Sequence, residues 1–185
     1  DYYGIDRNLT PDLVDNFTNQ GTTNLKSSDE TGLNIGTPIS YRAGDQPNNA
    51  LALNVFDNGE VAASGGTSGV IYSITNDINS REPSRINHFA HVNYNDNNKS
   101  IGKLLCINGA GIQYRWLRDH SIGKSYEKMN EAASSIPVGS EGISVIPFGN
   151  GAERMLNNKN IGTHICNINL NQHSHGHLYR SSLEG

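Results

Sequence analysis

Residues 60–75, EVAASGGTSGVIYSIT, consist of two strand-like runs on either side of a glycine-rich turn. Glu60–Ser64 and Val70–Thr75 have the composition of strands, and Gly65–Gly69 separates them, so the pattern predicts a β-hairpin. Glycines in such a turn let the backbone approach a ligand closely, and the N–H groups of the turn can converge on an anion. A tight hairpin that requires only positive φ angles would use the same residues. Both interpretations of the turn stay open at this point.

The segments after the hairpin predict further strands and then helices. Phe89–Tyr94 and Ile101–Ile107 are strand-like, and four strands in chain order favour an antiparallel meander. The hydrophobic period then changes, which predicts helices and one buried strand. These are the helices Gly111–Asp119 and Ser125–Ser135, the strand Gly142–Phe148, and a helix over Gly176–Glu184. Strands and helices in this order indicate an α/β fold, with a mixed sheet and flanking helices.

The residues before the hairpin are more polar and predict two helices and one strand. Thr10 and Pro11 have the residue types of an N-cap and a first helical position, which predicts a short helix at this point. Thr37–Ala43 is strand-like, and Gln46–Phe56 is helical in pattern. Asp45 lies at the junction of the two, where a carboxylate can accept a proton from a substrate hydroxyl. The alternative is that Asp45 only caps the helix.

Composition excludes several classes of protein and partner. The 185 residues carry a formal net charge of −4, and only 17% are charged, so the chain has no basic field that would attract nucleic acid. No apolar run approaches the roughly 20 residues that span a bilayer. Cys106 and Cys166 are the only two cysteines of the sequence and are not in CxxC spacing. This usage is typical of buried, reduced thiols in a cytosolic protein. We therefore expect neither a nucleic-acid nor a membrane partner, and a cytoplasmic location.

Three weaker patterns complete the set of candidates. The run from Asn108 to Gly111 (NGAG) puts small residues before a helix, where a phosphate or a ribose could approach, although helix–sheet packing explains it equally. The alternating histidines between His173 and His177 would share one face of a strand, but a helix beginning there would scatter them, so no metal site is expected. The arginines are interpreted as surface charges: Arg81, Arg85, Arg115 and Arg118.

Taken together, these motifs resemble the FGGY family of carbohydrate kinases, and within it the xylulose kinases most closely. The similarity is carried by TPISYRAGDQPNNA (37–50) followed by GEVAASGGTSG (59–69). Weaker matches follow in WLR (116–118), PF (147–148), GAER (151–154) and HLYRSSLE (177–184). The resemblance covers the chain from about residue 30 to its end.

The resemblance implies part of an actin-like ATPase fold, which is ribonuclease-H-like, with residues 1–57 ending the family's domain I and residues 58–185 beginning its domain II. It implies that Asp45 is the catalytic base and that Gln46 contacts the sugar. Gly66 and Thr67 would hold the β- and γ-phosphates of ATP, and Gly111 would contact the nucleotide. Mg²⁺ would accompany ATP, in agreement with the positioning and charge neutralisation that phosphoryl transfer requires.

The implied activity is phosphorylation of D-xylulose to D-xylulose 5-phosphate. Another polyol kinase of the family, acting on ribulose, gluconate or glycerol, is the alternative, and a non-catalytic actin-like domain is a third interpretation. The family's N-terminal DxGTxxxR/K loop and its C-terminal adenine-binding segment are not in this sequence. We therefore expect the chain to be a fragment of a longer protein and to be inactive alone. We expect the longer protein to form a homodimer.

Overall fold

The computed structural model describes residues 4–121 and 125–185, and its chain divides into two compact units. The first unit contains Asp1–Glu60, Ile74–Ile78 and Phe89–Gly102. The second contains Val61–Ser73, Asn79–His88 and Lys103–Gly185. The predicted domain boundary between residues 57 and 58 stays a prediction.

The first unit contains little regular structure before its main helix. A 3₁₀ turn, η1, covers Arg7–Leu9, and helix α1 covers Leu25–Thr31. A capping box starts α1, in which Asn24 and Ser27 exchange side-chain and backbone hydrogen bonds, and Gly32 ends it in the left-handed conformation. Helix α2 covers Asp45–Ala52 and buries Pro47 and Ala50. The helix predicted from residue 46 is therefore confirmed, but it ends four residues earlier than expected.

Two predictions for this unit were wrong. No helix follows Thr10, whose N–H and hydroxyl instead both bond the carbonyl of Arg7. The apolar side chains that should have formed the helix's buried face remain exposed, Leu13 by 98%, and a short helix without such packing is unstable in water. The run Thr37–Ala43 forms one bridge, Thr22 to Pro38, and no strand. Proline lacks the N–H that a continuous ladder requires.

The four-stranded sheet is built on the predicted hairpin. Strand β1 (Val61–Gly65) pairs antiparallel with β2 (Gly69–Thr75), from the pair Val61–Ser73 to the pair Gly65–Gly69. Alternation along β2 buries Tyr72 and Ile74 almost completely. The hairpin prediction is confirmed.

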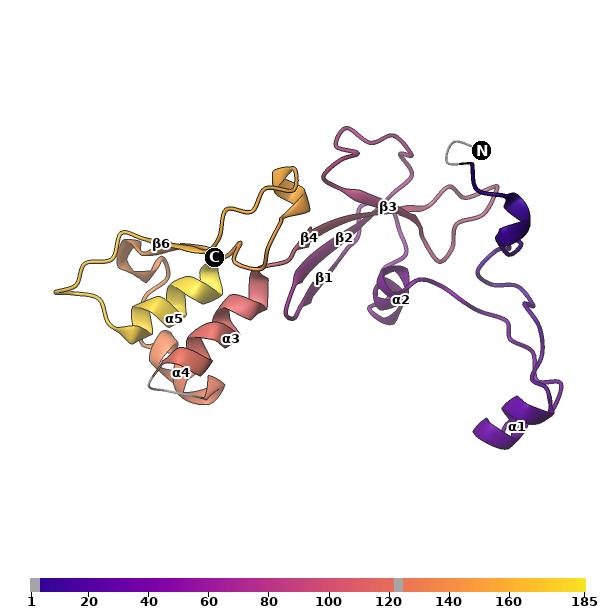
Figure 1. Ribbon diagram of the computed structural model, residues 1–185, viewed down its shortest axis with the longest axis horizontal. Coiled ribbons are helices and arrows are strands. Elements are labelled where there is room, and N and C mark those ends of the chain that lie inside the picture. The colour runs from indigo at the N-terminus through magenta and orange to yellow at the C-terminus, as the bar shows by residue number, and fades with distance from the viewer. Residues whose placement is uncertain (1–3, 122–124) are drawn as a thin grey trace. The chain divides into compact units, whose positions relative to one another are not determined.

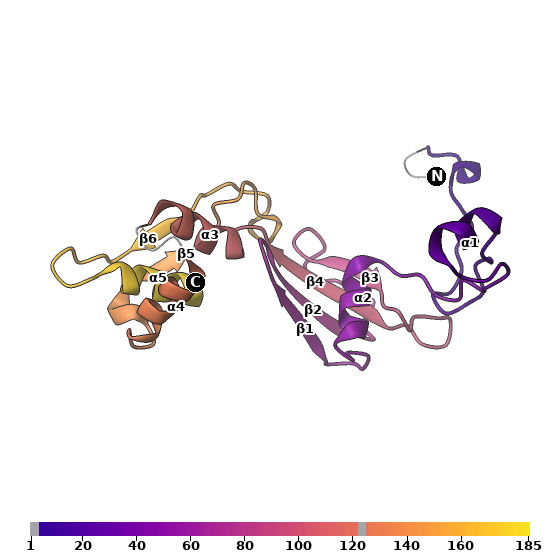
Figure 2. The ribbon, with the colours of Figure 1, turned by 90° about the horizontal axis from the view of Figure 1, so that it is seen from below.

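The remaining strands do not follow the predicted meander. Strand β3 covers Asn87–Ala90 and β4 covers Ile101–Ile107, and the order in the sheet is β1-β2-β4-β3. Figure 2 shows β4 beside β2. The longer β4 alternates buried residues such as Leu104 with half-buried ones, which suits an interior strand, whereas the short, half-exposed β3 suits an edge.

Three helices form the main hydrophobic core of the second unit. They are α3 (Ala110–His120), α4 (Tyr126–Ser134) and α5 (His175–Glu184), which Figure 1 shows grouped together. Leu117, Met129, Ala133 and Tyr179 pack against one another between them. Ser125 caps α4 by accepting the N–H of Lys128. All three predicted helices are confirmed.

A small antiparallel pair completes this unit. Strand β5 (Ser144–Ile146) pairs with β6 (His164–Cys166). The strand predicted over residues 142–148 is shorter than expected because Gly142 has a φ of +98° and a proline follows Ile146. Two 3₁₀ turns lie next to these strands in the chain: η2 (Ser140–Gly142) precedes β5, and η3 (Arg154–Leu156) lies in the connection between β5 and β6.

Two further sequence predictions can be compared with the described residues. Cys106 and Cys166 are both free, and both are half-buried rather than fully buried. Within residues 4–121 and 125–185, every helix is too short or too polar to cross a bilayer.

Candidate functional site

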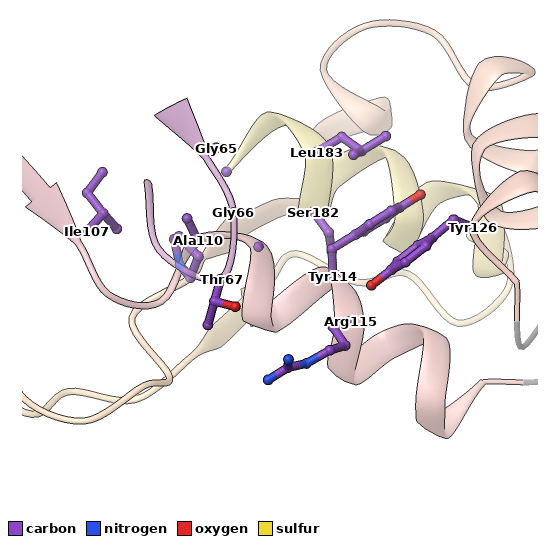
Figure 3. A pocket seen from close by; sticks show the side chains of 13 residues that line it. Gly65, Gly66, Thr67, Ile107, Ala110, Tyr114, Arg115, Tyr126, Ser182 and Leu183 are labelled. Carbon is purple, nitrogen blue, oxygen red and sulfur yellow. The ribbon is translucent and has the colours of Figure 1, made fainter. Parts of the chain in front are cut away.

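A cavity of about 540 Å³ opens in the second unit, where the tip of the β1–β2 hairpin meets the start of α3 (Figure 3). Its walls come from the hairpin tip, the first two turns of α3, the start of α4 and the end of α5. Among the residues that line it are Gly65, Gly66, Thr67, Ala110, Gly111, Tyr114, Arg115, Tyr126 and Leu183. Two of the motifs singled out from the sequence, GGTSG and NGAG, therefore line one cavity.

The hairpin tip and α3 approach each other more closely than a side chain would allow. A Cβ atom on Gly111 would lie 2.0 Å from the carbonyl oxygen of Gly66. The N–H of Ile112 donates to the carbonyl of Thr67 at 3.1 Å, which joins the two backbones directly. Glycine at position 111 is thus required by close packing, the role that small residues play where two backbones meet.

The glycines of the β1–β2 turn are not required by a left-handed backbone conformation. Gly65, Gly66 and Gly69 all lack positive φ, so the interpretation that the turn only needs left-handed glycines was wrong. A Cβ on Gly65 would meet nothing within 4 Å, and one on Gly66 would meet only the Ser68 carbonyl oxygen at 3.8 Å. Both residues line the cavity. Open space beside the turn leaves room for a ligand to contact its backbone.

The end of the cavity at the hairpin tip favours an anion. The backbone N–H groups of Ala110 and Gly111 begin α3 and bond no oxygen among the described residues, as is usual in the first turn of a helix. The positive end of the helix dipole lies there. Thr67 has an exposed hydroxyl, and Figure 3 shows the Arg115 side chain extending from α3 on the Thr67 side of the cavity. No Asp or Glu side chain is among the described residues that line the cavity.

The other end of the cavity is aromatic and apolar. The rings of Tyr114 and Tyr126 stack at 5.8 Å between centroids with 12° between their planes. Burial, together with nearby Tyr179 and Tyr126, raises the pKa of Tyr114, so its hydroxyl stays protonated and donates to Asn130 at 2.7 Å. The Arg118 guanidinium lies 4.6 Å from the centre of the Tyr126 ring. Flat aromatic walls of this kind suit a planar ring system.

Asp45 and Gln46 lie in the first unit, as the first two residues of α2. Gly44 is the N-cap, so the interpretation of Asp45 as the capping residue was wrong, as was the strand expected before it. The Asp45 Oδ1 atom accepts only the neighbouring N–H of Gln46, at 2.8 Å, and the residue is exposed. Its carboxylate can therefore accept a proton from another group.

The structure brings together Gly66, Thr67 and Gly111 at one cavity, and Asp45 and Gln46 belong to the first unit. Arg115 had been interpreted as a surface charge, and its place on the cavity wall was missed. Helical spacing was the available signal, because residues four apart lie on one face of a helix and Arg115 follows Gly111 by four. Among the described residues, no group of three His, Cys, Asp or Glu side chains could hold a metal ion.

Curated relatives and solved structures are similar to most of this chain. Gluconokinase of Bacillus subtilis is 27% identical over 167 residues, which cover 84% of this chain and 31% of the relative. Xylulose kinase of the same organism is 24% identical over 183 residues, covering 98% and 36%. The ligand-bound xylulose kinase of Lactobacillus acidophilus superposes with a TM-score of 0.82 at 20% identity, covering 98% and 36%.

The chain spans about a third of the length of these relatives, and no family model matches it. The similarity nevertheless runs through nearly the whole chain, and both named activities belong to one family of sugar kinases. The solved structure supports the partial actin-like fold independently of the sequence matches. This chain is a homologue of the FGGY carbohydrate kinases, and it has part of their actin-like ATPase fold.

Proposed function

We propose that the protein carrying this chain is an ATP-dependent kinase that phosphorylates a hydroxyl group of a sugar or polyol. The observation that carries the proposal is the meeting of Gly66, Thr67 and Gly111 at one cavity, although these residues were singled out on separate motifs. The named activities of the relatives support the same reaction class.

The residues around the cavity fit a nucleotide in two ways. The free N–H groups of Ala110 and Gly111, the Thr67 hydroxyl and the Arg115 cation suit phosphate oxygens. The apolar end beside Tyr126 suits the flat base. A volume of about 540 Å³ is within the usual range for cofactor sites. Mg²⁺ would be held by phosphate oxygens and water, the ligands that it usually retains in kinases.

ATP, when bound, supplies the γ-phosphoryl group, and the chain's own residues position it and manage the proton. Thr67 and the turn backbone hold the phosphates, and Arg115 offsets their negative charge. Asp45 takes the proton of the attacking hydroxyl as the new O–P bond forms and the bond to the β-phosphate oxygen breaks. Gln46 orients the sugar. This division of roles follows the general requirement of phosphoryl transfer for positioning and charge stabilisation.

Two substrates are supported within this class. D-Xylulose, which would give D-xylulose 5-phosphate, is supported by the xylulose kinase relative, and gluconate by the gluconokinase relative. A coupled assay of ADP release by the full-length protein, with ATP and Mg²⁺, should compare D-xylulose, gluconate, ribulose and glycerol. Turnover of one of them supports the kinase. Absence of turnover with all four, together with normal ATP binding, would favour the non-catalytic actin-like domain.

A further inference from the structure

Glu153 is a fully buried carboxylate that bonds the backbone just before α3. Its exposed fraction is 0%. The Oε2 atom accepts the N–H of Asn108 at 2.9 Å, and the Oε1 atom accepts the N–H of Gly109 at 3.0 Å. Burying an ionised carboxylate is costly unless its oxygens are satisfied. Both oxygens of Glu153 are satisfied by backbone donors that lie more than forty residues away in the chain.

This carboxylate fixes the turn that leads into α3, a helix without a side-chain cap. Gly109 is the N-cap residue of α3 and has no side chain to bond the first N–H groups. Glu153 supplies a negative charge at the same end of the helix, where the dipole favours it. Hydrogen bonds from N–H groups to a carboxylate are stronger than those to a neutral acceptor. The start of α3 is thus held in place from another segment.

The segment that carries Glu153 is itself fastened to the same turn. The Asn108 side chain donates to the carbonyl of Ala152 at 2.9 Å, and the Asn150 side chain donates to the carbonyl of Asn108 at 3.0 Å. The Glu153 backbone is in turn paired with Lys159, whose carbonyl accepts the Glu153 N–H at 3.0 Å. Side-chain and backbone bonds therefore fix the carboxylate relative to residues 108–109.

The turn that Glu153 holds leads directly into the candidate nucleotide site. Ala110 and Gly111, whose N–H groups are free, follow the two bonded residues in the chain. Gly111 then packs against Gly66 at the hairpin tip. Glu153 itself is not among the residues that line the cavity. A displacement of residues 108–109 would therefore move the N–H groups of Ala110 and Gly111 at the cavity wall. The chemical identity of every residue that lines the cavity would stay the same.

We propose that Glu153 is a positioning residue for ATP, which holds residues 108–109 so that the N–H groups of Ala110 and Gly111 and the hairpin tip face the phosphates. The inference rests on the proposed function, and it adds a residue that acts through the backbone. The proposal predicts that a change at Glu153 alters the affinity for the nucleotide and leaves the affinity for the sugar unchanged.

The test is Glu153→Gln in the full-length protein, with the KM for ATP, the KM for the sugar, and kcat measured separately. Glutamine keeps one acceptor oxygen and points an NH₂ group at the second N–H donor, so one bond is lost and two donors face each other. We expect the KM for ATP to rise roughly tenfold or more, as for loss of a charged hydrogen bond, while the KM for the sugar stays unchanged.

Two control variants separate positioning from loss of stability. Glu131→Gln makes the same chemical change on an exposed position of α4 and should match the wild type. Met129→Ala removes a side chain that is 0% exposed in the helical core and is not among the residues that line the cavity. It should lower the fraction of folded protein, and hence the maximal rate, with both KM values unchanged. If Glu153→Gln behaves like Met129→Ala, the proposal is overturned.

A second variant covers the case in which Glu153→Gln does not fold. Glu153→Asp keeps the carboxylate but shortens the side chain by one methylene, so it should raise the KM for ATP less than glutamine does and leave the KM for the sugar unchanged. A wild-type KM for ATP in Glu153→Asp would then overturn the proposal. If the wild type neither binds ATP nor transfers phosphate, the proposed function fails. A working wild type with an unaltered variant removes the positioning role alone.

Discussion

Replacing Gly111 by alanine should force the hairpin tip away from α3. The new Cβ would lie 2.0 Å from the Gly66 carbonyl oxygen and 2.9 Å from its carbon, whereas real Cβ atoms stay at least 3.0 Å from such atoms. The turn must therefore move by at least about 1 Å, since the obstacle is backbone and not a flexible side chain. The same movement weakens the bond from the Ile112 N–H to the Thr67 carbonyl.

The magnitude follows from three contributions. Overpacking of this kind costs about 1–3 kcal/mol. Loss of the Ile112–Thr67 hydrogen bond adds about 1 kcal/mol, and the higher helix propensity of alanine returns about 1 kcal/mol. The free energy of unfolding should therefore fall by about 1–3 kcal/mol, and the KM for ATP should rise because the hairpin tip has shifted.

Urea unfolding followed by Trp116 fluorescence measures this change, because Trp116 is the chain's single tryptophan and lies on α3. Gly65→Ala is the matched control. A Cβ there would meet nothing within 4 Å and the φ angle is not positive, so stability should stay within about 0.5 kcal/mol of the wild type. Equal unfolding midpoints for Gly111→Ala and Gly65→Ala would refute the close approach of the hairpin tip to α3.

Three further predictions concern Thr67, Asp45 and Cys106. Thr67→Val should raise the KM for ATP with little change in stability, because Thr67 is exposed and its hydroxyl has no partner among the described residues; normal nucleotide kinetics with a large loss of stability would contradict its phosphate role. Asp45→Asn should lower kcat by about 10²–10⁴-fold at nearly constant ATP affinity, since it removes the basicity of a general base but keeps the acceptor oxygen for the following N–H. Near-normal kcat would remove Asp45 from the catalytic residues. Cys106 should react slowly with iodoacetamide at pH 8 and faster only at higher pH, because burial, and then the Glu153 charge, raise its thiol pKa; a midpoint at or below the ordinary thiol value would contradict this environment.

Local sequence patterns correctly predicted the helices and strands in which local conformational preference and tertiary burial favour the same structure. The alternating strand at 69–75 and the helices with Met129 and Tyr179 on their inner faces formed as expected, because local preference and burial favour the same structure. The helix after Thr10 had correct capping residues but no partner for its apolar face, and tertiary packing decides short helices. The order of β3 and β4 also depends on packing, which no local pattern contains.

For the candidate site, the sequence alone indicated which residues carry the chemistry, and the tertiary structure decided which of them meet. GGTSG, NGAG and Asp45 were recognisable from residue type and spacing, since glycines permit close approach and a carboxylate accepts protons. The contact between Gly66 and Gly111 required the hairpin and α3 to pack together. The sequence signalled the place of Arg115 only through its spacing of four residues from Gly111, and no local pattern indicated the role of Glu153. The cavity wall and the contacts of the buried carboxylate are each formed by segments more than forty residues apart in the chain. Only folding brings such segments within hydrogen-bond distance.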